Sequence, residues 1–207
     1  GWILVYTSFI MMCLRFMAGP IVHRLTPLGT LAVCAGLAAC GLVALSSAQG
    51  AGAIILAATL YGVGKTFFWP TTLGIVAEQF PKGGALTLNA MGGVGMLGVG
   101  VIGAMLMGNV QDKTIDQELA KNAAVHEQVT TEKTGLLGKY FSVDQDKLAK
   151  VDDTAKALVQ SVQDASKKMA LKQMAVLPAI MLVCYIGILA YFKSRGGYKP
   201  VDISASH

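Results

Sequence analysis

Long apolar runs separated by short polar turns make up most of this chain. The five runs cover residues 1–18, 28–48, 53–77, 84–108 and 170–192. An α-helix rises about 1.5 Å per residue, so roughly 20 apolar residues cross a hydrocarbon layer about 30 Å thick. Helices of soluble domains keep one polar face, which these runs lack. The pattern predicts an all-α integral membrane protein with five transmembrane helices.

Four regions follow from this pattern. Residues 1–108 are expected to hold four transmembrane helices, joined by connections that contain Gly or Pro at 19–27, 49–52 and 78–83. Residues 109–169 form a polar insertion, 170–193 the final transmembrane helix and 194–207 a tail.

The insertion has a helical pattern. One helix is predicted from apolar residues that recur at three- and four-residue steps: Leu148, Val151, Ala155, Leu158 and Val162. A second helix is expected over 114–133, ended by Gly135 and Gly138. We interpret the insertion as a solvated helical cap, with a partner-binding domain as the alternative.

Charge is strongly segregated along the chain. Only 14% of residues are charged, against about 25% in soluble domains. Residues 111–168 hold nine lysines and ten acidic residues, whereas the rest of the chain has eight basic and two acidic residues. The net charge of +5 therefore reflects basic residues beside a membrane, and it does not indicate a nucleic-acid partner.

Basic residues in the short connections predict the orientation. If the helices alternate, one side receives Arg15, Arg24, Lys82, Lys193, Arg195 and Lys199. Lysine and arginine mark the cytoplasmic side. The expected location is therefore the bacterial cytoplasmic (inner) membrane, with the C-terminus in the cytoplasm and the insertion on the outer face.

No catalytic chemistry is expected. The four cysteines, Cys13, Cys34, Cys40 and Cys184, lie in apolar runs and form no CxxC pair or Cys/His cluster. His126 and His207 show no metal-ligand spacing either. Since no nucleophile, base and orienting group occur together, we expect neither an enzyme nor a metal or cofactor.

The first connection resembles the signature loop of the major facilitator superfamily of secondary transporters. That loop reads Gly, three residues, Asp, then Arg or Lys, and here Gly19, His23 and Arg24 fill those places, with His for the usual Asp. The resemblance extends over residues 1–108 and 170–199. It implies that the five helices match helices eight to twelve of that fold. The rest of the transporter would then come from a missing N-terminal half, and this chain would be the C-terminal portion of something longer.

Lys65 is the most informative single residue. Twelve residues separate it from each end of its run, which places it about 18 Å from either membrane boundary. A charge at that depth costs about 2.5–3.5 kcal/mol on insertion scales and usually faces a water-filled cavity. Three interpretations stay open: contact with a substrate or coupling ion, a salt bridge to the absent half, and a neutral amine with a lowered pKa.

Residues around Lys65 extend this candidate substrate site. Tyr61 and Trp69 lie four positions before and after it on the same helix face, and Thr66 is adjacent. The aromatic rings suit a sugar or another amphipathic ligand, and packing against neighbouring helices is the alternative. Pro70 is expected to kink the helix near this cluster. Gly64-Lys65-Thr66 is not a phosphate-binding loop, because the required first glycine would fall at Thr59.

The fourth run contributes a polar residue and a packing face. Asn89 is expected to form an interhelical hydrogen bond, with pore lining as the alternative. Gly92, Gly95 and Gly98 are small residues that let helix backbones approach closely in lipid.

Two functions remain open. The first is a secondary active transporter, for instance a symporter, that moves a small organic anion or sugar by alternating access. The second is a non-transporting scaffold subunit that binds partner membrane subunits within a larger complex.

Overall fold

Helices form most of the chain, as the apolar runs predict. The described part of this computed structural model comprises residues 2–135 and 138–201. Within it, four helical segments are long and apolar enough to cross a membrane: Pro27–Ser47, Ala51–Gln79, Pro81–Leu119 and Asp153–Ser194. The protein is therefore a helical integral membrane protein. The first predicted run forms a helix of 15 residues, which is shorter than a membrane crossing.

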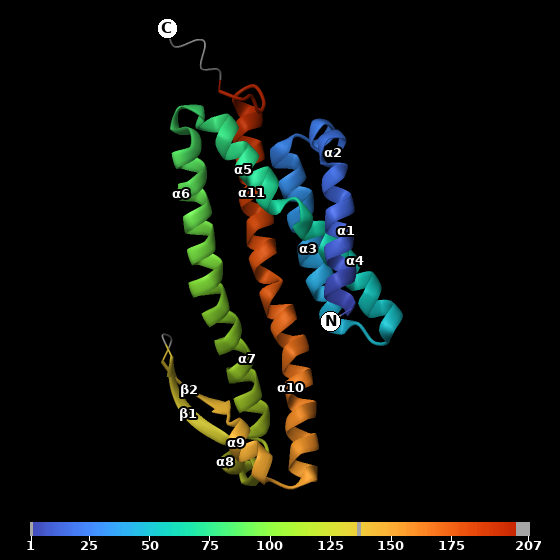
Figure 1. Cartoon of the computed structure of the whole chain (residues 1–207), viewed down its shortest axis with the longest axis vertical. Helices are drawn as coiled ribbons and strands as arrows, with labels where there is room; N and C mark the ends of the chain where they lie inside the picture. Colours follow the sequence, from blue (N-terminus) through green and yellow to red (C-terminus); the bar gives the residue numbers. More distant parts are fainter. Residues whose placement is uncertain (1, 136–137, 202–207) are drawn as a thin grey trace. The chain divides into compact units, whose positions relative to one another are not determined.

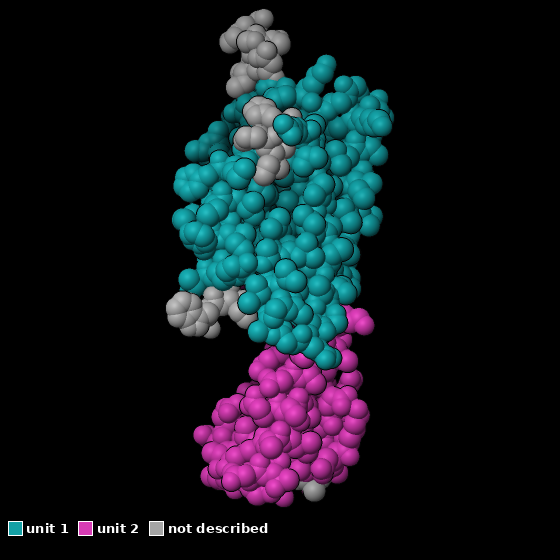
Figure 2. All heavy atoms as spheres, turned by 90° about the vertical axis from the view of Figure 1, so that its right-hand side faces the viewer, with its two compact units in different colours: residues 1–95, 174–207 teal, residues 96–173 magenta. Residues whose placement is uncertain are grey.

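The chain divides into two units, coloured separately in Figure 2. The first unit comprises residues 1–95 and 174–207, and the second residues 96–173. Helices of the first unit are α1 (Trp2–Phe16), α2 (Ala18–Leu25), α3 (Pro27–Ser47), α4 (Ala51–Thr66), α5 (Phe68–Gln79), most of α6 (Gly84–Leu97) and α11 (Val176–Ser194). A short 3₁₀ turn, Pro81–Gly83, joins α5 to α6.

Helix α3 is the centre of the first unit. Helices α2, α4, α5 and α11 all pack on α3, and α1 packs on α4 (Figure 1). The buried face of α3 carries mostly small residues, including Ala35 and Ala38, which are 0% and 1% exposed. Small side chains let neighbouring helices approach closely, and van der Waals packing of this kind holds helices together in lipid.

The connection predicted at 19–27 contains a helix instead of an open turn. Helix α2 begins at Ala18, which places Pro20 in its first turn, where a missing N–H costs nothing. The next turn is made by Thr26, which has φ of 64° and whose Oγ1 accepts a hydrogen bond from the Gly29 amide at 3.3 Å. Pro27 then starts α3 at a position suited to proline.

The second unit combines helices with a hairpin. Its elements are a π-helical stretch (Gly98–Gly103), α7 (Ala104–Leu119), α8 (Ala123–Val129), β1 (Thr130–Gly135), β2 (Gly138–Val143), α9 (Gln145–Lys150) and α10 (Asp153–Met174). Strands β1 and β2 pair antiparallel, with Thr130 opposite Val143. The core of this unit is formed by Ile115, Leu119, Val129 and Val159.

Two predictions for the insertion were wrong in detail. The helix expected over 114–133 ends at Leu119, and residues 130–135 form β1, because the β-branched side chains of its three threonines favour a strand. The helix expected over 148–162 is two helices, α9 and α10, separated at Val151 and Asp152. The periodic apolar residues nevertheless pack on the core, among them Leu148, Val151 and Val162.

Candidate functional site

The helix that carries Lys65 is interrupted in the middle of its apolar segment. Helix α4 ends at Thr66, Phe67 links the two helices, and α5 begins at Phe68. Pro70 has no N–H to donate to the Thr66 carbonyl four residues earlier, and its ring crowds that carbonyl. The next amide resumes the helix, since the Thr71 N–H donates to the Phe67 carbonyl at 3.0 Å. The break therefore lies at Phe67, two residues beyond Lys65, and follows from Pro70.

Lys65 and Tyr61 lie together on α4. The Lys65 Nζ is 5.1 Å from the centroid of the Tyr61 ring, which is a cation–π contact between residues one turn apart. Both side chains are half-buried. Among the described residues, no carboxylate forms an ion pair with Lys65. The ammonium thus lies midway along an apolar helical segment with an aromatic face as its neighbour.

Two glycines bring α4 close to α3 at this position. A Cβ on Gly41 would lie 2.6 Å from the Tyr61 Cα, and a Cβ on Gly64 would overlap the backbone nitrogen of Ala38. Neither site has room for a side chain, so the helix carrying Lys65 and Tyr61 is fixed against α3. Sequence reasoning missed these two glycines. The signal was present, because small residues inside apolar runs mark close helix approach.

Thr66 and Trp69 are directed to other neighbours. Thr66 is fully buried, and its Oγ1 donates to the Gly62 carbonyl at 2.6 Å, so its hydroxyl is used within α4. The Trp69 ring lies against Gly95 of α6, where an added Cβ would come within 2.8 Å of the ring. This contact favours the packing interpretation of Trp69. Of the predicted site residues on this segment, Lys65 and Tyr61 are the two that lie in contact with each other.

Helix α6 has little contact with the rest of its unit. No residue of α6 is buried, and a Cβ on Gly92 would meet nothing within 4 Å. Gly98, in the second unit, likewise has open space around it. Asn89 is exposed and makes no hydrogen bond to any described residue. Of the three glycines predicted to form a packing face, Gly95 thus contacts Trp69, whereas Gly92 and Gly98 have open space around them.

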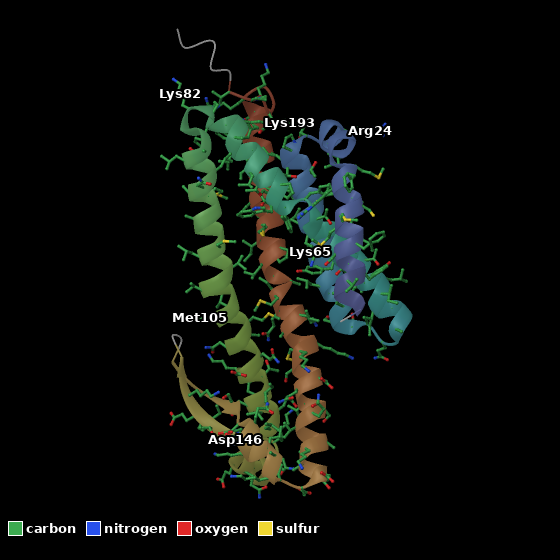
Figure 3. All side chains as sticks on the ribbon, viewed as in Figure 1. Arg24, Lys65, Lys82, Met105, Asp146 and Lys193 are labelled. Carbon is green, nitrogen blue, oxygen red and sulfur yellow. The ribbon has the colours of Figure 1, made fainter. Side chains whose placement is uncertain are left out.

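The residues of the predicted signature loop lie at one end of the first unit. Arg24 is at that end together with Lys82 and Lys193, whereas Lys65 lies well inside the unit (Figure 3). A Cβ added at Gly19 would meet nothing within 4 Å, so a side chain is tolerated there. The side chain of His23 lies outside the described residues.

A cavity of about 340 Å³ connects this loop with the broken helix. It contains one carboxylate, Glu78, and the buried Thr71 near otherwise apolar walls. The lining is formed by Ala18, Gly19, Pro27, Phe67, Pro70, Thr71, Gly74 and Glu78. The predicted loop residue Gly19 and the predicted kink residue Pro70 therefore meet at one hollow.

Fold and site together define a helical integral membrane protein with a lysine midway along a broken apolar helix. No protein family matches the sequence, and comparisons with curated proteins and with solved structures give no match.

Proposed function

We propose that this chain is part of a secondary active transporter of the major facilitator type. The observation that carries the proposal is the half-buried Lys65, which lies beside the break between α4 and α5 in a 29-residue apolar segment. Non-helical backbone and charge at membrane depth occur where they line a cavity or contact other protein. Broken helices near the middle of the membrane form the substrate sites of many transporters.

The proposed substrate is a small organic anion. Lys65 supplies the positive charge, and Tyr61 supplies a flat apolar surface one turn away. An anion that replaced the ring as the partner of the ammonium would gain a charge-assisted hydrogen bond. A sugar would use the ring more than the charge, so the two substrate classes differ in their dependence on Lys65.

The proposed topology follows the basic residues. Arg24, Lys82 and Lys193 share one end of the first unit, and that end is proposed to face the cytoplasm (Figure 3). The chain would supply helices eight to twelve, and a further set of helices would complete the translocation path.

The experiment is a ligand screen on the full chain in lipid nanodiscs. Small carboxylates, inorganic phosphate and monosaccharides are tested for a rise in thermal unfolding temperature, and hits are tested for uptake in proteoliposomes. Lys65→Met is expected to lose stabilisation by anions, while Lys82→Met, a matched change at the surface, is expected to keep it. Equal responses of the two variants would remove Lys65 from the site. Stabilisation by sugars in both would favour the sugar.

A second candidate is a membrane scaffold without transport. The observation that favours it is the exposure of α6. None of the residues of this helix is buried, and Gly92 and Gly93 have open space around them. Such a face suits a partner membrane helix. The intact mass of the native polypeptide and of its complex separates the two candidates. A native polypeptide near 21.7 kDa found in a stable hetero-complex would favour the scaffold.

A further inference from the structure

The C-terminal segment turns back over the end of α11. Gly196 and Gly197 follow that helix with φ of 95° and 97°, a left-handed conformation that residues with side chains rarely adopt. Their amides close the helix end, with the Gly197 N–H donating to the Phe192 carbonyl at 2.8 Å. This paired turn reverses the chain and aims residues 198–201 at the end of α5.

Three hydrogen bonds then join this segment to α5. The Tyr198 hydroxyl donates to Glu78 Oε2 at 2.6 Å, and the Val201 N–H donates to the Glu78 carbonyl at 2.9 Å. Gln79 Nε2 donates to the Lys199 carbonyl at 3.0 Å. The first and last of these bonds join residues 120 positions apart in the sequence, so the contact is tertiary and specific.

The Tyr198 side chain also touches α11. Its ring centroid is 5.3 Å from that of Phe192, in a tilted arrangement. Burial, together with the hydrogen bond to Glu78, raises the pKa of Tyr198 to about 12. The hydroxyl therefore stays protonated, and able to donate, throughout the physiological pH range.

Glu78 belongs to the cavity as well as to this contact. It lines the hollow of about 340 Å³ together with Thr71, Gly74 and Pro70, all on α5. The contact made by the C-terminal segment is thus at the edge of the cavity, on the helix that Pro70 separates from α4.

We propose that residues 198–201 form a clamp that holds the end of α5 against the end of α11 and keeps the cavity narrow at that edge. Release of the clamp lets α5 move away at the break near Phe67 and widens the cavity. The clamp goes beyond the proposed transport function. The test of the clamp needs no substrate. The clamp proposal can therefore fail while the transport proposal holds, and the transport proposal can fail while the clamp proposal holds.

The test measures access to the cavity with a cysteine reporter. Thr71→Cys is introduced into the full chain after replacement of the four native cysteines by Ala, since Thr71 lines the cavity and is only 7% exposed. The protein is held in lipid nanodiscs, and the rate of labelling by a polar maleimide is recorded.

Loss of one hydrogen bond of the clamp should speed labelling. Gln79→Ala is expected to raise the rate by a factor of roughly 2 to 12, which corresponds to the net free energy of one neutral hydrogen bond, and Tyr198→Phe by a larger factor, because its hydroxyl donates to a carboxylate. Tyr191→Phe is the matched control, because that tyrosine is on α11, exposed, and forms no described hydrogen bond to α5. Its labelling rate should equal that of the parent.

Two outcomes overturn the proposal. One is an unchanged rate in the double variant Tyr198→Phe/Gln79→Ala. The other is a general loosening, detected with Ala58→Cys in place of Thr71→Cys, because Ala58 is buried at 3% exposure in α4, a helix that takes no part in the hydrogen bonds of the clamp. Faster labelling at position 71 with unchanged labelling at position 58 supports the clamp.

Discussion

Single glycines decide how closely the helices of the first unit approach. Gly64 on α4 faces the backbone of Ala38 on α3, whereas Gly92 on α6 faces open space. Both are in helices, so both lower intrinsic helix stability by about 1 kcal/mol relative to alanine. At Gly64 that cost is offset, because the missing side chain permits the contact that fixes Lys65 and Tyr61 in place.

Gly64→Ala and Gly92→Ala should therefore have opposite effects on stability. The methyl group at position 64 would overlap the Ala38 backbone, and overpacking of this kind costs about 1–3 kcal/mol. The melting temperature of the protein in nanodiscs is expected to fall for Gly64→Ala and to stay level or rise for Gly92→Ala. Equal melting temperatures for the two variants would show that α3 and α4 do not approach at Gly64.

At the scale of elements, the break between α4 and α5 separates two helices that the hydrophobic pattern presents as one. Proline explains the position of the break, since the lost hydrogen bond is the one to Thr66, immediately before the link at Phe67. A break at this point leaves Lys65 one residue before the end of α4, the helix that Gly64 brings close to α3.

Pro70→Ala should restore a continuous helix. The new amide at position 70 can donate to the Thr66 carbonyl, and removal of an interior proline stabilises a helix by up to about 3 kcal/mol. Amide hydrogen exchange over residues 66–71 is expected to slow. Pro81→Ala is the control, because Pro81 lies at the start of a helical turn, where proline is tolerated. No slowing in Pro70→Ala would mean that packing on α3, not Pro70, sets the break.

Elements built from local patterns were predictable, and contacts between distant residues were not. Hydropathy located the four membrane-length segments because burial in lipid depends on each run alone. The sequence does not distinguish helix α2 from a turn, since Gly19 and Pro20 occur in both. The hairpin also escapes sequence reasoning, because its strands gain stability from pairing, which a sequence window does not contain.

The candidate site shows the same division. Lys65 and Tyr61 are one turn apart, so their contact followed from helix geometry. The contact of Trp69 with Gly95 joins two helices, α5 and α6. The contact of Tyr198 with Glu78 joins the C-terminal tail to α5. Spacing along the chain carries no information on such pairs.

At the scale of the whole molecule, the two units have separate cores. The first is built on α3 and its small residues, and the second on Ile115, Leu119, Val129 and Val159. The charge distribution matches this division, since almost all the acidic residues fall within 111–168. A destabilising substitution in one core should therefore unfold that unit and leave the other unit folded.

Val159→Asp tests this independence. Val159 is 0% exposed, and a carboxylate placed there without a partner should destabilise the second unit by about 3 kcal/mol or more. Fast amide exchange is expected over α7 to α10, with protection of α3 and α4 unchanged. Ala157→Asp adds the same charge at an exposed position of α10 and should leave both units protected. Loss of protection in α3 and α4 as well would mean that the membrane helices need the second unit to fold, and the chain would then behave as one cooperative structure.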